Sequence, residues 1–175
     1  MNTGTLQFVV NLHRVRPAHI LPSRLDSLFR RLGLAGDDAK SIEDEIWALW
    51  MHHPHQDAAQ VLDRAACEIA AELFDIAETR LATLVRRCPD WPEVWHKRGT
   101  LYYLLNRDDE SILDFHRTLE LEPRHFGALC GVGEICLARG EWETALAAFK
   151  AALKLNPHLE DVKSTIARLE GHPPL

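Results

Sequence analysis

Apolar residues recur at intervals of three and four positions through most of the chain, which is the spacing of helices that bury one face. The clearest early example consists of four apolar residues and a glycine that can end the helix: Leu25, Leu28, Phe29, Leu32 and Gly33. Ser23 and Asp26 have the spacing of a capping box, so a helix is predicted to begin there.

A second amphipathic pattern runs from about residue 38 to residue 51, and Pro54 forces its end. Its inward positions are Ile42, Ile46, Leu49 and Trp50. We expect these two helices to form a hairpin over residues 21–57 that caps the part of the chain that follows. Residues 1–20 show no readable periodicity and are expected to form a flexible arm or an edge segment.

The central part of the chain repeats itself every 34 residues. Pro89, Pro123 and Pro157 keep this interval. Other residue types share the same offset: Gly99 and Gly133, Phe115 and Phe149, Leu119 and Leu153, Leu121 and Leu155. Proline ends a helix, glycine lets a neighbouring helix approach, and phenylalanine fills the space between two helices. A period held by four residue types together predicts stacked helix–turn–helix units.

Residues 92–125 closely resemble a tetratricopeptide repeat, which is a 34-residue pair of antiparallel helices. The residues at its signature positions are Trp95, Gly99, Tyr102, Ser111, Phe115, Thr118 and Pro123. Residues 126–159 match the same pattern through Leu129, Gly133, Cys136, Ala145, Phe149, Ala152 and Pro157. Residues 58–91 are similar to a degenerate third repeat that lacks the aromatic signature residues and keeps Val61, Ala65, Ala77, Leu81, Leu84 and Pro89.

Local signals within the repeats agree with this frame. Asp90 is a predicted N-cap ahead of Pro92, and the helix that follows is expected to run to about Leu105. Acidic residues at 108–110 would complement the dipole at the start of the partner helix. After the last repeat, residues 159–169 predict one more amphipathic helix, whose polar outer face would cover the apolar flank of the array.

The sequence therefore predicts an all-α protein, a right-handed superhelical array of three tetratricopeptide repeats with additional helices at both ends. The predicted parts are a flexible arm (1–20), a capping hairpin (21–57), the repeats (58–91, 92–125 and 126–159) and a capping helix with a tail (160–175). The chain is similar to small bacterial tetratricopeptide repeat proteins of unassigned role.

The composition of the chain argues against several classes of function. The chain has 20 Lys and Arg against 26 Asp and Glu, a formal net charge of −6, which argues against sequence-independent nucleic-acid binding. Its four cysteines form no CxxC pair and are too sparse for a disulfide scaffold. Because no apolar run is long enough to span a membrane and no secretory pattern begins the chain, we expect a cytoplasmic protein. Residues 1–25 contain three arginines and no acid, so an organelle transit segment is an alternative, as is an export signal hidden by a mis-assigned start.

The resemblance implies that the first helix of each repeat lines a concave groove. The residues expected in this groove or at its rim are Glu93, His96, Lys97, Thr100, Tyr103, Arg124, His125, Cys130, Glu134, Leu137 and Asp63. Such a groove suits an extended peptide or a helix of another protein. Because no nucleophile elbow, phosphate-binding glycine loop or HExxH motif is present, we predict a non-enzymatic scaffold without a cofactor.

Two more specific functions can be tested on the residues. Family members that bind a C-terminal carboxylate use Lys, Asn and Arg side chains, and the corresponding positions are Leu62, Ala66, Lys97, Gly127 and Gly131. None of these matches, so a chaperone binder of that kind is disfavoured. A cluster of three histidines, His52, His53 and His55, gives the alternative of a metal-binding or metal-responsive protein, although no cysteine lies nearby to complete a structural zinc site.

Overall fold

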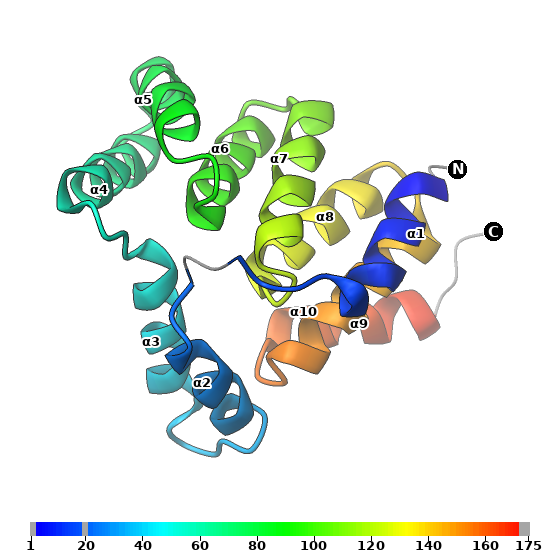
Figure 1. Ribbon diagram of the computed structural model, residues 1–175. Coiled ribbons are helices and arrows are strands. Elements are labelled where there is room, and N and C mark those ends of the chain that lie inside the picture. The colour runs from blue at the N-terminus through cyan, green and yellow to red at the C-terminus, as the bar shows by residue number, and fades with distance from the viewer. Residues whose placement is uncertain (1–2, 19–20, 172–175) are drawn as a thin grey trace.

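A computed structural model describes residues 3–18 and 21–171 of the chain. Every regular element in these ranges is helical, which confirms the all-α prediction (Figure 1). The helices are α1 (Thr3–Asn11), the 3-10 turn η1 (Leu12–Arg14), α2 (Arg24–Leu32), α3 (Ala39–Met51), α4 (Gln56–Ala70), α5 (Phe74–Arg87), α6 (Pro92–Leu104), α7 (Asp108–Leu121), α8 (Phe126–Ala138), α9 (Trp142–Leu155) and α10 (Glu160–Gly171). None of the helices in these ranges is both long and apolar enough to cross a membrane.

Three helix pairs, α4–α5, α6–α7 and α8–α9, stack in the order of the chain (Figure 1). The second helices α5, α7 and α9 keep the 34-residue interval at both ends. The turn before each of them contains a residue in the left-handed region: Glu72, Asn106 and Gly140, with φ of 58°, 57° and 72°. The degenerate repeat therefore has the same turn as the two well-formed repeats. α10 packs against α9 after the last repeat.

In the two well-formed repeats a phenylalanine of the second helix occupies the space beside a glycine of the first helix. A Cβ atom on Gly99 would lie 2.9 Å from the Phe115 ring, and one on Gly133 would lie 2.5 Å from the Phe149 ring. This close approach explains the glycines in the middle of α6 and α8, where glycine costs about 1 kcal/mol relative to alanine.

The starts of two helices differ in detail from the predictions. The N-cap of α6 is Trp91 rather than Asp90, and neither Trp91 nor Ser23, the N-cap of α2, makes a side-chain capping hydrogen bond. Packing takes the place of capping at α6, because Trp91 is 1% exposed and donates its indole N–H to the carbonyl of Trp50 at 2.7 Å. Pro92 adds a fixed φ at the first helical position.

The N-terminal segment is more ordered than the sequence indicates. Instead of a flexible arm, residues 3–11 form α1, which packs against α9, and the ring of Phe8 lies 4.4 Å from that of His116 on α7. Val9 is buried. Because α1 is short and rich in β-branched residues, its own helical signal is weak, and burial against the second helices stabilises it. Within the predicted arm, residues 1–2 and 19–20 lie outside the described residues, and so does the tail at 172–175.

The hairpin of α2 and α3 forms, but it does not cap the first repeat. Its apolar residues, including Leu28, Ile46 and Trp50, share one core with α1 and α7–α10. A second core joins α4, α5 and α6, and of the hairpin only Met51 at the end of α3 packs against it. The expected placement on the first repeat is therefore corrected: the hairpin lies against the middle and last repeats, where Trp50 is buried and Trp47 is half-buried.

Candidate functional site: the concave face

The first helices of the repeats, α4, α6 and α8, lie next to one another and carry the predicted groove positions (Figure 1). These positions have two different environments. The α2–α3 hairpin covers the positions near the N-terminal ends of α6 and α8, whereas positions in the later turns of the same helices remain accessible. The predicted groove is thus partly occupied by the chain itself.

Burial divides the predicted site residues into three groups. Glu93 and His125 are 0% exposed and His96 is 8% exposed. The half-buried residues are Lys97, Thr100, Arg124, Cys130 and Leu137. The exposed residues are Asp63, Tyr103 and Glu134. Glu93, His96 and His125 therefore lie inside the protein rather than in an open groove or at its rim, which corrects the prediction for these three residues.

Two tryptophans of α3 fill the covered part of the groove. The centroid of the Trp47 ring lies 5.6 Å from that of His96 and 5.4 Å from that of His125, and the Lys97 ammonium lies 5.6 Å from the Trp47 ring. Trp50 stacks on His125 with 4.0 Å between centroids and 15° between planes. Such aromatic contacts stabilise beyond the burial of the rings. α3 consequently takes the place that a partner helix would have in this part of the groove.

The sequence of the last repeat is matched to this arrangement. A Cβ atom on Gly127 would lie 2.6 Å from the Trp47 ring, so the absence of a side chain there admits the tryptophan. Farther along α3, Glu43 accepts a hydrogen bond of 3.1 Å from the Asn156 amide, and the His158 ring contacts a main-chain carbonyl at the end of α2 at 3.1 Å. The hairpin is therefore held by specific contacts along its length.

A buried carboxylate lies beside these aromatic rings. One oxygen of Glu93, Oε1, lies 3.2 Å from both His96 Nδ1 and Lys97 Nζ, and the other, Oε2, lies 2.9 Å from His125 Nε2. Burial by itself would raise the pKa of Glu93. The charge on His96 and the hydrogen bonds from His125 and His96 outweigh that effect and hold this pKa well below its ordinary value. Glu93 is therefore ionised inside the protein.

The neighbours of His125 fix its protonation. His125 Nδ1 accepts a hydrogen bond of 3.1 Å from the Ala128 backbone N–H, so the proton of the neutral ring is on Nε2, which donates to Glu93. Burial, followed by the charge on His96, lowers the pKa of His125 to about 4. The ring is therefore neutral at pH 7 and caps α8 while it stacks on Trp50.

Glu93, His96 and His125 bring three potential metal-ligand atoms within 4.8 Å of one another in the described part of the chain. The chemistry of the donors does not fit a metal ion. His125 Nε2 carries the proton that a ligand nitrogen must lack, and the Lys97 ammonium already contacts Oε1 of Glu93. The arrangement fits a structural hydrogen-bond network instead.

Of the histidines that suggested a metal site in the sequence, His53 has a structural role instead. His53 is 6% exposed, its Nδ1 accepts a hydrogen bond of 3.1 Å from the backbone N–H of His55, and its ring lies 4.6 Å from that of Trp91. Burial lowers the pKa of His53. His52 and His55 are exposed, and the three side chains do not form a three-ligand group within residues 3–18 and 21–171. The metal-binding alternative therefore has no support.

The predicted groove residues that keep solvent exposure include two acids and a tyrosine. The predicted residues with solvent exposure there are Asp63, Thr100, Tyr103, Glu134 and Leu137. Tyr103 is 39% exposed. Lys97, a predicted basic residue of the groove, is paired with Glu93 and does not offset the charges of Asp63 and Glu134.

Sequence reasoning missed the part that Trp47 plays in covering the groove. A signal for it is present, because Trp47 lies outside the stripe formed by Ile42, Ile46 and Trp50. A helix with a second apolar face has to be covered on two sides. α3 is covered by α2 on one side and by the repeats on the other.

The comparisons with known proteins agree with the repeat geometry. A family model described as tetratricopeptide repeat matches residues 126–159. A TPR repeat-containing protein of Rhizobium etli is 31% identical over 136 residues, which make up 77% of this chain and 67% of that protein. Tetratricopeptide repeat protein 37 of Xenopus laevis is 31% identical and superkiller complex protein 3 of Homo sapiens is 30% identical, each over 99 residues.

The extent of these similarities differs. The chain spans about two thirds of the length of the bacterial relative. It spans 6% of the length of each of the two animal proteins, so its similarity to them concerns a short stretch of repeats. The match to the bacterial protein covers most of the chain, and the helix pairs described above have the 34-residue period of the family. The chain therefore belongs to the tetratricopeptide repeat family.

Proposed function

We propose that the chain is a non-enzymatic scaffold that binds a basic segment of another protein on the accessible part of its concave face. Tetratricopeptide repeats are generally protein-interaction modules, and this chain belongs to their family. The proposal of a basic partner segment rests on one observation, which is that α3 occupies only part of the groove. α3 fills the part next to Glu93, while Asp63, Tyr103 and Glu134 remain exposed.

The chemistry of the accessible residues describes the partner. Tyr103 offers an aromatic anchor and Leu137 an apolar contact, and Asp63 and Glu134 would attract Lys or Arg side chains. A partner segment would lie beside α3 without displacing it, because Trp47 packs against the buried rings of His96 and His125. An extended peptide or a short helix with basic and apolar residues fits this description.

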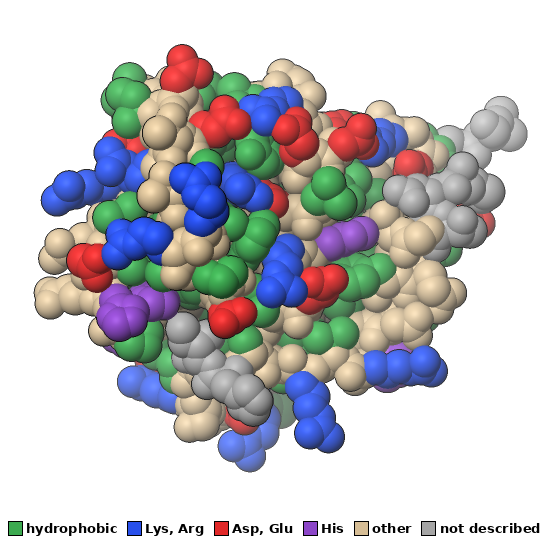
Figure 2. Space-filling view, turned by 45° about the horizontal axis from the view of Figure 1, so that its top comes forward, with side chains coloured by type: hydrophobic (Ala, Val, Ile, Leu, Met, Phe, Trp, Pro, Cys, Tyr) green, Lys and Arg blue, Asp and Glu red, His purple; other side chains and the backbone are tan. Residues whose placement is uncertain are grey.

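The distribution of charge supports a protein as the partner. On the face shown in Figure 2, acidic and basic side chains are interspersed with apolar ones. The formal net charge of the chain is −6. A nucleic-acid site calls for a basic patch or stripe. Mixed charges with exposed apolar groups are instead typical of surfaces that bind other proteins.

Site-specific photo-cross-linking in the cells that produce the protein tests this proposal. A photoreactive phenylalanine analogue in place of Tyr103 should form adducts with a small set of proteins. The charge reversals Asp63→Lys and Glu134→Lys, combined in the same chain, should reduce these adducts about tenfold or more, because like charges would then face the partner. The same analogue in place of Leu113, which is 67% exposed on α7, is the matched control.

Adducts of equal amount and identity from positions 103 and 113 would contradict the proposal, and so would adducts at 103 that are indifferent to the charge reversals. The circular dichroism spectrum of each variant shows whether the helices are intact. Lys97 is left unchanged in these variants. It is paired with the buried carboxylate of Glu93, so a charge reversal there would disturb the hairpin.

A further inference from the structure

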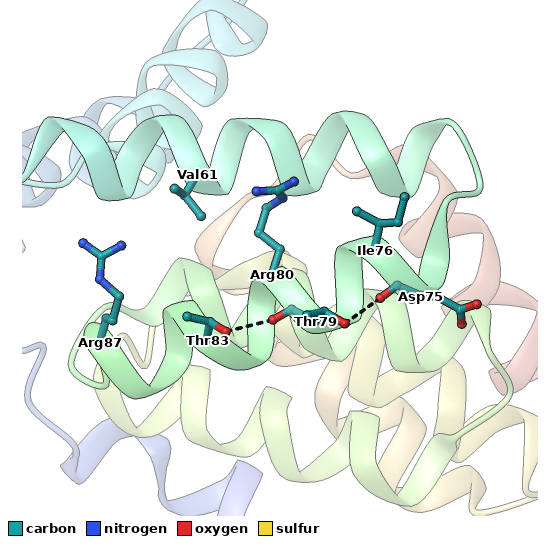
Figure 3. Close-up of a pocket in the computed structure, with 7 residues that line it drawn as sticks. All are labelled: Val61, Asp75, Ile76, Thr79, Arg80, Thr83 and Arg87. Atoms are coloured by element: carbon teal, nitrogen blue, oxygen red, sulfur yellow. Dashed lines mark hydrogen bonds between the residues drawn. The ribbon is translucent and has the colours of Figure 1, made fainter.

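The outer face of the first repeat has no covering element among the described residues. α5 and α4 border a shallow cavity of about 590 Å³, shown in Figure 3. Its lining residues are Val61, Asp75, Ile76, Thr79, Arg80, Thr83 and Arg87. Ile76 is 51% exposed. An exposed isoleucine beside a cavity with an apolar floor indicates a surface that is suited to a contact.

The last repeat shows what this face can hold. In the 34-residue frame, Thr79, Thr83 and Arg87 of α5 correspond to the α9 residues Ala147, Ala151 and Leu155. Those three residues lie beside the N-terminal segment of the chain, and α1 packs against α9 there. The same face of a repeat therefore accepts an additional helix within this protein.

The exposed stripe of α5 has a symmetric sequence. Asp75, Thr79, Thr83 and Arg87 follow one another at intervals of four residues, and Figure 3 shows them in a row along the helix. Thr79 donates its hydroxyl to the carbonyl of Asp75 at 3.0 Å, and Thr83 to that of Thr79 at 3.1 Å. Since both hydroxyls have partners in their own helix, the stripe offers threonine methyl groups between an acid at one end and a base at the other.

We propose that this face of α5 pairs with the same face of a second copy of the chain in an antiparallel, two-fold arrangement. In that arrangement Asp75 of each copy meets Arg87 of the other, and Thr79 meets Thr83. The opposite ends of the helix dipoles also meet, which favours the antiparallel orientation. Parallel pairing would bring like charges together.

The charged groups around the stripe leave this pairing possible. Arg80 makes two hydrogen bonds to Glu68, of 2.7 Å and 2.5 Å, so its charge is matched within its own chain. Arg87 contacts Asp57 at 2.6 Å, and its side chain is 49% exposed. The Arg87 guanidinium has five N–H donors and can contact Asp57 and the Asp75 carboxylate of a second copy together.

Analytical ultracentrifugation of the full chain over a wide concentration range tests the pairing. The wild-type protein should shift from the monomer mass toward twice that mass as its concentration rises. Asp75→Arg and Arg87→Asp should each weaken association about tenfold or more, because each places like charges opposite one another. The double variant Asp75→Arg/Arg87→Asp restores opposite charges across the two-fold axis and should regain association.

Cross-linking measures the register of the two helices. Thr79→Cys and Thr83→Cys are made separately in a Cys67→Ser background, since Cys67 is an exposed cysteine. A mixture of the two chains should form disulfide-linked dimers more readily than either chain alone. Identical positions on the two copies are offset by about 6 Å along the helix axis, which exceeds the Cβ separation of a disulfide.

Three results would overturn the proposal. A wild-type protein that stays monomeric at every concentration excludes the pairing and leaves the face to a different partner. Dimers that neither single charge reversal weakens would lie on another surface. A double variant that folds but remains as weakened as the single variants would show that Asp75 and Arg87 do not face one another.

Discussion

At the scale of single residues, Glu93 shows how one buried charge joins parts that are distant in sequence. Its carboxylate lies on α6, contacts Lys97 on the same helix, and accepts a hydrogen bond from His125 just before α8. Trp47 of α3 packs against His96 and His125, two of its partners. A buried ion pair adds little net stability over an apolar pair. Removing one partner is nevertheless costly, because it leaves the other polar groups without a compensating charge. Glu93 is therefore a determinant of where the hairpin docks.

Glu93→Gln should destabilise the protein strongly. The change leaves the half-buried Lys97 ammonium and the buried His125 ring next to a neutral amide, at an expected cost of about 3 kcal/mol in the free energy of unfolding. Urea unfolding followed by circular dichroism measures this value. Glu134→Gln, which also lies on the concave face but is exposed, should change it by less than about 0.5 kcal/mol. Equal small effects of both changes would contradict the assignment of an ionised buried carboxylate.

The pKa of His125 should make stability depend on pH. This pKa lies near 4 in the folded protein against an ordinary value of 6.5, so between these values the unfolded chain binds more protons. The stability from neutral His125 is complete above pH 6.5 and is lost as the pH falls toward 4, by about 3 kcal/mol. His125→Asn keeps an oxygen that can cap α8 and removes the titration.

The measurement is the difference in the free energy of unfolding between wild type and His125→Asn at several pH values. This difference should shrink as the pH is lowered from 7 to 4. The pKa values of His53 and His116 are also lowered by burial, but both residues are present in both proteins, so their effects cancel. A difference that is constant with pH would show that His125 does not titrate as described.

At the scale of helices, the positions that can be predicted from sequence are mainly those fixed by the 34-residue repeat. The 34-residue period places α6 through α9 because Gly99, Phe115, Gly133 and Phe149 each have a contact role that the pattern itself requires. The docking site of the hairpin depends on the fit of Trp47 against Gly127, a contact between distant residues that no local periodicity encodes. α1 depends likewise on burial against α9. Sequence therefore predicts the repeats and the C-terminal helix that covers the last of them, but not where α1 and the hairpin dock.

Gly133→Ala tests the close packing of a repeat. By helix propensity alone the change would stabilise α8 by about 1 kcal/mol. Because the new Cβ atom would lie 2.5 Å from the Phe149 ring, we expect a net loss of about 1–3 kcal/mol instead, measured by thermal or urea unfolding. Gly36→Ala, where nothing lies within 4 Å of the new atom, is the control and should be nearly neutral. A stabilised Gly133→Ala protein would refute the packing argument.

At the scale of the whole molecule, the chain has two hydrophobic cores, and one of them is covered by more helices than the other. The larger core joins the last repeats to α1 on the side of the second helices and to the hairpin on the concave side. The smaller core contains only α4, α5 and α6 together with neighbouring residues. The indole N–H of Trp91, in the smaller core, donates to the carbonyl of Trp50, in the larger one. The first repeat is therefore the part of the described chain with the least covering structure.

Because the first repeat has the least covering structure, we predict that it unfolds locally before the rest of the protein. Leu81→Ala and Leu129→Ala remove the same atoms from leucines that are both 0% exposed, one in each core, and each should cost about 2–5 kcal/mol locally. In hydrogen exchange, Leu81→Ala should accelerate the amides of α4 and α5 and leave α8 and α9 protected, since stability in stacked repeats is a sum of local terms. Leu129→Ala should accelerate α8, α9 and the hairpin. If both variants accelerated exchange evenly along the chain, the link between Trp91 and Trp50 would be strong enough to make the two cores one cooperative unit.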